Sequence, residues 1–181
     1  MPRKWCLAFL LAGVLAVLAG PAAPLARAQR QDYLTQTERN KIRNAFSASA
    51  KIKLFLDFAA DRLARFNREL VRKDTGPRRN EFLNSLLNSF THCVNSASYR
   101  IDSGVNNGQK VKKAIEDFQK RVPKFLAELE KLKTNGTDIR PFRFSLSDSI
   151  SDLKGDIRDA EKQLKKLEFN PPVKLPHRER H

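Results

Sequence analysis

Apolar residues recur at three- and four-residue steps along a stretch in the second half of the chain, Val111 to Leu132. Alternating steps of four and three are the spacing of a heptad seam. A helix of this length extends roughly 33 Å at 1.5 Å per residue, and such a stripe is buried only against other helices. The stripe consists of Val111, Ile115, Phe118, Val122, Phe125, Leu129 and Leu132.

Three further segments show the same spacing: Ile52 to Leu70, Leu83 to Val105, and Leu146 to Leu167. Short polar stretches with glycine separate them, such as Asn106-Asn107-Gly108, in which Gly108 suits the positive φ that closes a helix. The chain shows neither alternating strand patterns nor a βαβ rhythm. The sequence therefore predicts an all-α fold, an antiparallel up-down-up-down four-helix bundle with a short extra N-terminal helix.

The extra helix is predicted from Thr35 and Glu38, which stand at the spacing of a capping box. It ends near Phe46, and Ser47-Ala48-Ser49 is typical of a break before the first long helix. This short helix packs either on the bundle or on a partner protein.

Prolines mark two other positions. Pro123 lies inside the Val111 to Leu132 helix and predicts a kink just before it, because proline removes a backbone hydrogen bond and clashes with the preceding turn. The last long helix is predicted to begin at Pro141 or at Ser145.

The N-terminus resembles a secretory signal peptide. Arg3 and Lys4 precede an apolar, uncharged run from Trp5 to Ala19, and Ala26-Arg27-Ala28 offers a small-x-small cleavage pattern. The expected division is a signal peptide (1–28), a helical bundle domain (29–170) and a basic, proline-broken tail (171–181). An uncleaved anchor is the alternative, although the apolar run is short for a membrane span. The protein is then secreted or periplasmic.

The charge of the chain is strongly positive. Removing the first 28 of 181 residues leaves 153, and the loss of Arg3, Lys4 and Arg27 lowers the formal net charge from +15 to +12. Such a charge favours anionic partners, for example phosphorylated lipids or cell-wall polymers. Specific nucleic-acid recognition is disfavoured, because the phenylalanines belong to the core stripes and leave none to stack on bases.

The remaining cysteine, Cys93, has no intramolecular disulfide partner once Cys6 is removed. We expect a buried small hydrophobe beside Phe90, Val94 and Ala97, with an intermolecular disulfide as the alternative.

No metal or cofactor signature is present in the sequence. A di-metal bundle needs inward carboxylates with Glu-x-x-His pairs, and haem attachment needs Cys-x-x-Cys-His. His92 is expected on the polar side of its helix, whereas His177 and His181 belong to the tail. We therefore expect neither a metal site nor a cofactor.

Catalytic residues are not predicted either, and we expect a protein that is not an enzyme. Cys93 and His92 are neighbours that point about 100° apart on a helix. The carboxylate pairs Asp57 with Asp61 and Asp152 with Asp156 are expected to be solvated and ion-paired with nearby basic residues.

One cluster of arginines is a candidate anion-binding surface, because a guanidinium can hold phosphate or carboxylate with two parallel hydrogen bonds. A merely soluble, charged face is the alternative, since acids are interleaved. The candidate residues are Arg62, Arg65, Arg68, Arg72, Arg78 and Arg79.

Two resemblances accompany these patterns. The stretches Tyr33-Leu34-Thr35, Lys51 to Phe66, Pro123-Lys124-Phe125-Leu126 and Pro141-Phe142-Arg143-Phe144 resemble a group of uncharacterised exported helical proteins of acidobacterial type. That resemblance implies export and a helical fold and assigns no activity. Leu34 to Glu38 is also similar to the Leu-Thr-x-x-Gln motif of periplasmic helical stress chaperones, although Glu38 replaces the glutamine.

Taken together, the sequence indicates a non-enzymatic exported bundle that binds a protein or an anionic envelope component. Two alternatives stay open: a structural or oligomer-forming periplasmic bundle without a small-molecule ligand, and a periplasmic holdase-type chaperone. The oligomeric state does not follow from the sequence.

Overall fold

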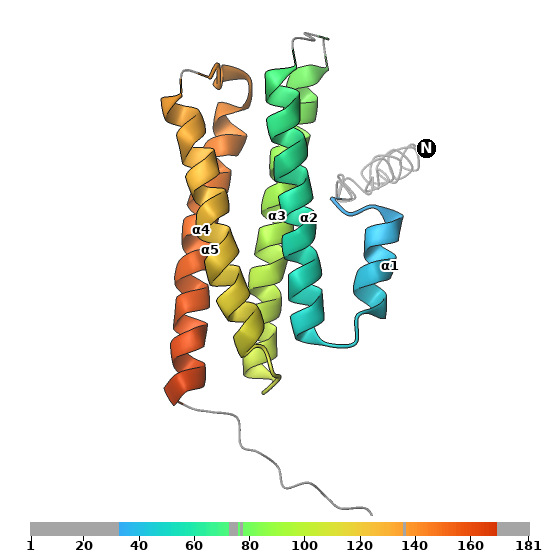
Figure 1. Ribbon diagram of the computed structural model, residues 1–181, viewed down its shortest axis with the longest axis vertical. Coiled ribbons are helices and arrows are strands. Elements are labelled where there is room, and N and C mark those ends of the chain that lie inside the picture. The colour runs from blue at the N-terminus through green and yellow to red at the C-terminus, as the bar shows by residue number, and fades with distance from the viewer. Residues whose placement is uncertain (1–32, 73–75, 77, 136, 170–181) are drawn as a thin grey trace, which may run out of the picture. The chain divides into compact units, whose positions relative to one another are not determined.

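The structure, a computed structural model, describes residues 33–72, 76, 78–135 and 137–169. Every element in these ranges is helical, which confirms the all-α prediction (Figure 1). The expected signal peptide and basic tail lie outside the described residues. The elements are α1 (Gln36–Asn44), α2 (Ala48–Val71), α3 (Arg79–Asn106), α4 (Lys112–Thr134), the 3-10 turn η1 (Arg140–Phe142) and α5 (Arg143–Phe169).

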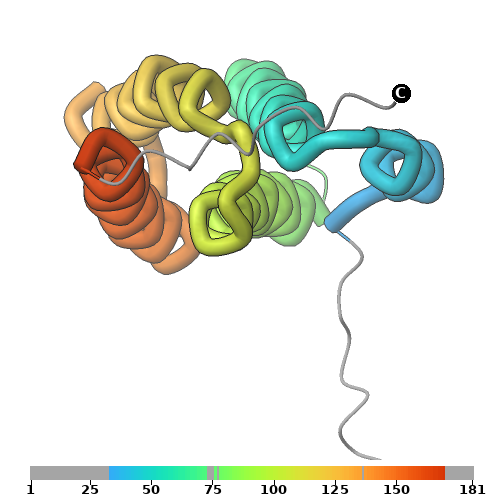
Figure 2. Tube along the Cα trace, turned by 90° about the horizontal axis from the view of Figure 1, so that it is seen from below, coloured from blue at the N-terminus to red at the C-terminus, as the bar shows by residue number. Residues whose placement is uncertain are grey.

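The four long helices enclose one core. α2 packs against α3 and α4, and α5 packs against the same two helices, as the end-on view shows (Figure 2). The consecutive helices α3 and α4 contact each other far less than each contacts α5. The order of neighbouring helices around the core is therefore α2, α3, α5, α4, and the connection between α3 and α4 crosses the bundle.

The core consists almost entirely of the residues that the spacing places on one side of each helix. Five stripe residues pack against the core but are only partly buried: Leu70, Leu132, Ile157, Leu164 and Leu167. The fully or nearly fully buried members include Ile52, Leu56, Leu63, Phe66, Leu83, Leu87, Phe90, Val94, Ile101, Ile115, Phe118, Val122, Leu129, Leu146 and Leu153.

Local capping fixes where α1 and α2 begin. The Thr35 side chain accepts from the Glu38 amide, and the Glu38 carboxylate accepts from the Thr35 amide at 2.8 Å, so the predicted capping box is present. Ser47 caps α2 by accepting from the amide of Ala50, and α2 therefore starts at Ala48. The break between the two capped helices is the three-residue connection Ala45 to Ser47, earlier than predicted, and Ala48 and Ser49 already belong to α2.

The turn between α3 and α4 depends on two glycines. Gly108 has a φ of +64°, as predicted, and allows the chain to leave α3. Gly104 permits a close approach, since a Cβ at this position would lie 2.6 Å from Cγ1 of Val111.

The prolines occupy helical positions. Pro141 lies in the first turn of η1, where its missing N–H costs nothing, and α5 begins at Arg143 between the two predicted starts. Pro123 lies inside α4 and is exposed, and the kink expected there stays a prediction.

Candidate functional site at the basic end of the bundle

Arg62 does not belong to an exposed anion-binding surface, and this part of the sequence prediction needs correction. The residue is only 7% exposed. Its guanidinium donates to both carboxylate oxygens of Glu38 at 2.9 and 2.8 Å, and to the Tyr33 carbonyl at 2.6 Å. Arg62 therefore joins α2 to α1 and the segment before it, and its donors are occupied.

The surroundings of this ion pair determine two pKa values. Burial alone would raise the pKa of Glu38, but hydrogen bonds from Arg62 and Thr35 outweigh burial and hold it below its ordinary value. Burial raises the pKa of the Cys93 thiol to about 12, and the positive charge of Arg62 offsets this only in part. Cys93 is buried, as predicted, and its high pKa keeps it a neutral thiol.

Three of the other candidate arginines make local contacts. Arg65 pairs with Asp61 at 2.9 Å, and Arg72 pairs with Glu69 at 3.0 Å. Arg79 donates to the carbonyls of Glu69 and Leu70 at 2.9 and 3.0 Å, which satisfies acceptors left open in the last turn of α2.

Arg68 and Arg78 are exposed and make no ion pair within the described residues. Arg68 lies in the last turn of α2, and Arg78 is the N-cap residue of α3. They are thus the members of the predicted cluster that keep an unpaired guanidinium, and both lie where α2 ends and α3 begins.

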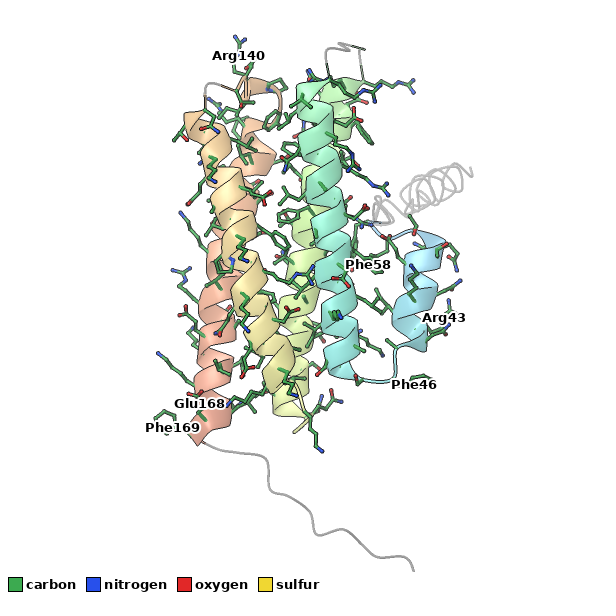
Figure 3. The ribbon with its side chains drawn as sticks, in the orientation of Figure 1. Arg43, Phe46, Phe58, Arg140, Glu168 and Phe169 are labelled. Carbon is green, nitrogen blue, oxygen red and sulfur yellow. The ribbon has the colours of Figure 1, made fainter. Side chains whose placement is uncertain are left out.

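The turn between α4 and α5 lies beside this region. The Asn84 side chain on α3 donates to the Pro141 carbonyl at 2.9 Å and accepts from the Ser145 hydroxyl at 2.7 Å. Sequence reasoning did not include the arginines of this second turn, Arg140 and Arg143. Figure 3 shows Arg140 at this end of the helices.

These two arginines differ in what they contact. Arg140 pairs with Asp138 at 2.9 Å, and its hydrogen bonds lower the pKa of Asp138 to about 2, so that Asp138 stays negatively charged. Arg143 lies 4.9 Å from the ring centre of Phe144 and has no acidic partner within the described residues. Arg143 is therefore a third unpaired cation near the α2 to α3 turn.

Large apolar side chains are exposed at the same end of the bundle. Val71 is 82% exposed, Phe82 49% and Phe144 74%. We call the six residues Arg68, Arg78, Arg143, Val71, Phe82 and Phe144 the basic end. Cations combined with exposed apolar side chains suit the boundary between an anionic surface and its apolar interior.

The two carboxylate pairs behave differently from each other. Asp57 pairs with Arg121 at 2.8 Å and Asp61 with Arg65, which are ion pairs of the expected kind. Asp156 is not a solvated ion-pair member, and this expectation was wrong. Burial, together with the charges of Asp152, Asp159 and Asp102, raises the pKa of Asp156 to about 6.

Polar groups of α3 face Asp156. Ser98, which is buried, forms a hydrogen bond with its carboxylate. In the orientation that satisfies both ends of its amide, Asn95 donates to Oδ2 of Asp156 at 2.8 Å and to the Thr91 carbonyl at 3.2 Å. Asp156 thus joins α5 to α3 and accepts hydrogen bonds while its own charge is disfavoured.

Asp156→Asn is expected to stabilise the fold at pH 7 by about 1–2 kcal/mol, allowing for partial exposure of the side chain. The raised folded-state pKa means that the contribution of Asp156 to stability is most favourable below about pH 4 and falls as the pH rises to about 6. The variant should not show this decrease in stability with rising pH. Urea unfolding at several pH values measures it, with Asp148→Asn, an exposed change on the same helix, as the control.

His92 is exposed, and its ring lies 5.3 Å from that of Tyr33 in a tilted arrangement. Within the described ranges, no group of three or more His, Cys, Asp or Glu residues is placed to share a metal ion. None of the helices in these ranges combines the length and hydropathy needed to cross a bilayer.

Comparison with known protein families, with curated proteins and with solved structures finds no match to this chain.

Proposed function

We propose that this protein is exported, loses its signal peptide after Ala28, and acts without catalysis by binding an anionic surface of the cell envelope through the basic end. The observation that carries the proposal is the combination, at one end of the helices, of three arginines that have no acidic partner among the described residues with three exposed apolar side chains. Neither feature alone indicates a partner, because scattered surface hydrophobes and soluble charge are common.

The proposal includes the arrangement of the helices. We place α2, α3, α4 and α5 in an antiparallel up-down-up-down order with a left-handed, heptad-like seam. Short connections support this order, since a helix that follows a turn of a few residues has to reverse direction relative to its predecessor. In this order the α2 to α3 turn and the α4 to α5 turn share one end, and the arginines of both can contact the same surface.

Electrostatics sets the expected strength of the interaction. Each arginine near an anionic membrane contributes about 1 kcal/mol, and the contribution decreases over a Debye length. Phe82 and Phe144 add apolar contact that salt does not screen. Binding should therefore be steeply salt dependent without being abolished entirely by moderate salt.

The test is sedimentation of the protein with vesicles of phosphatidylglycerol mixed with phosphatidylcholine, at low and moderate salt. The double variant Arg78→Ser/Arg143→Ser is expected to bind about thirtyfold more weakly, which corresponds to the loss of about 2 kcal/mol. The matched control Arg158→Ser/Lys165→Ser removes the same charge from exposed positions farther along α5 and should change binding by less than threefold.

Two outcomes contradict the proposal. The first is the absence of binding to anionic vesicles at low salt, which leaves the structural or oligomer-forming bundle as the better interpretation. The second is equal weakening by the two double variants, because binding would then follow net charge and not the basic end.

A further inference from the structure

A groove of about 580 Å³ lies between the C-terminal half of α1 and the first turns of α2. Lys41, Asn44 and Ala45 line it from the side of α1, and Ala50, Lys53 and Leu54 line it from α2, with Asp57 at its edge. This volume is within the range of small-molecule sites in proteins.

The groove exists because α1 is fastened at its other half. The Arg62 to Glu38 pair and the hydrogen bond between the Tyr33 hydroxyl and Ser96 Oγ, at 2.9 Å, hold the N-terminal part of α1 and the residues before it. No residue of α1 is fully buried. Near the end of α1, the small side chains of Ala45 and Ala50 leave the space between the helices unfilled.

The charges at the groove are asymmetric. Lys41 and Lys53 are exposed, and neither makes an ion pair with any described residue. The carboxylate of Asp57, by contrast, accepts from Arg121 at 2.8 Å, and the same arginine donates to the Leu56 carbonyl at 3.0 Å. The two lysines are thus free to meet an anion, while the acid at the edge is already neutralised.

Phe46 is next to the groove in the chain but is not one of the residues that line it. This residue directly follows Ala45 and is fully exposed, at 105% of the reference area. Figure 3 shows it in the connection between α1 and α2. A wholly exposed phenylalanine beside an unfilled apolar groove offers additional area to a ligand that lies along it.

We propose that this groove binds a single acyl chain that carries an anionic head group. The chain lies over Ala45, Ala50 and Leu54, and the head group lies between Lys41 and Lys53. The combination of an apolar floor with two unpaired cations at the rim selects this chemistry over a neutral or cationic amphiphile. The site is separate from the basic end and goes beyond the proposed membrane binding.

The experiment titrates the full chain with dansylaminoundecanoic acid below its micelle concentration and follows the dansyl fluorescence. Ala50→Phe fills the groove and is expected to weaken binding at least tenfold. The matched control Ala127→Phe makes the same exchange at an exposed position of α4 and should leave the dissociation constant within twofold. Far-UV circular dichroism of both variants establishes that each remains folded.

A second arm tests the head group. Lys41→Glu/Lys53→Glu should weaken the carboxylate probe at least tenfold, and Arg158→Glu/Lys165→Glu, with an equal change of charge on α5, should not. Competition then distinguishes the source of the anion. Displacement by dodecanoate alone indicates a fatty acid, whereas displacement by lysophosphatidylglycerol as well indicates a phospholipid fragment. The cationic amphiphile dodecyltrimethylammonium should not displace the probe.

Three results would overturn the inference: no saturable probe binding, equal effects of Ala50→Phe and Ala127→Phe, or displacement by the cationic amphiphile as readily as by the anionic one. The Arg78→Ser/Arg143→Ser variant should keep full probe binding. Failure of the groove and failure of the basic end are therefore distinguishable.

Discussion

Phe90→Ala should lower the free energy of unfolding by about 4 kcal/mol, the largest loss we expect from any single substitution here. Phe90 is 0% exposed, and its ring meets Phe125 edge to face, with ring centres 5.7 Å apart and planes at 80°. The pair connects α3 to α4, the two consecutive long helices that contact each other least along their backbones. Removing the ring leaves a cavity and ends this contact.

Urea unfolding followed by circular dichroism measures this loss. Phe82→Ala is the matched control, because it is the same exchange on the same helix at a residue that is half exposed. The control should cost less than about 1 kcal/mol. A Phe90→Ala variant as stable as the control would contradict a core that is packed through this ring.

The core was predictable because one period identifies one face. The residues from Val111 to Leu129 that step by four and three are all buried. This spacing places them on one face of the helix, and that face is the one that packs against the core. What the period does not give is the neighbour of each face. The placement of α3 and α4 across the core from each other depends on how the helices pack around Phe90 and Phe125. The sequence of one helix alone does not determine this placement.

Arg62 shows how a second face is missed. Phe55, Phe58 and Arg62 also step by three and four along α2, and both phenylalanines are at least nine-tenths buried. This second stripe faces α1, to which Arg62 is bound through Glu38. The sequence signal for the burial of Arg62 was therefore its position on the same helical stripe as two phenylalanines. Grouping Arg62 with the neighbouring arginines hid that signal.

The basic end and Asp156 depended on contacts between distant segments. Arg143 lies near the first turns of α3 because Asn84 of α3 forms hydrogen bonds with Pro141 and Ser145, on either side of it in the chain. Asp156 is partly buried on α5, where Ser98 of α3 forms a hydrogen bond with its carboxylate. The sequence shows which charges lie along one helix. Which charges from two separate turns lie close together is known only from the fold.

Arg62→Met should release α1 from the bundle at a cost of about 3 kcal/mol. Methionine keeps the apolar length of the side chain but leaves the Glu38 carboxylate, whose side chain is 15% exposed, without its cation. Removing one partner of a buried ion pair costs several kcal/mol because the other charge stays desolvated. The Tyr33 carbonyl also loses its 2.6 Å donor.

The loss should be local, because α1 has no fully buried residue and its helix contacts are with α2. Hydrogen exchange is therefore the measurement: amides of Gln36–Asn44 should exchange more than a hundredfold faster in Arg62→Met, while the core of α3 is nearly unchanged. Arg65→Met, which breaks an exposed pair with Asp61, is the matched control and should leave α1 protected.

The pH dependence of exchange separates the ion pair from packing. The folded-state pKa of Glu38 lies below its ordinary value of 4.5, so the pair stabilises α1 docking above that pH and loses its effect as the pH falls through the lowered pKa. Protection of α1 in the wild type should therefore fall in acid, while Arg62→Met should show no such acid-induced loss. Equal acid sensitivity in both proteins would mean that apolar contacts, and not Arg62 with Glu38, hold α1 in place.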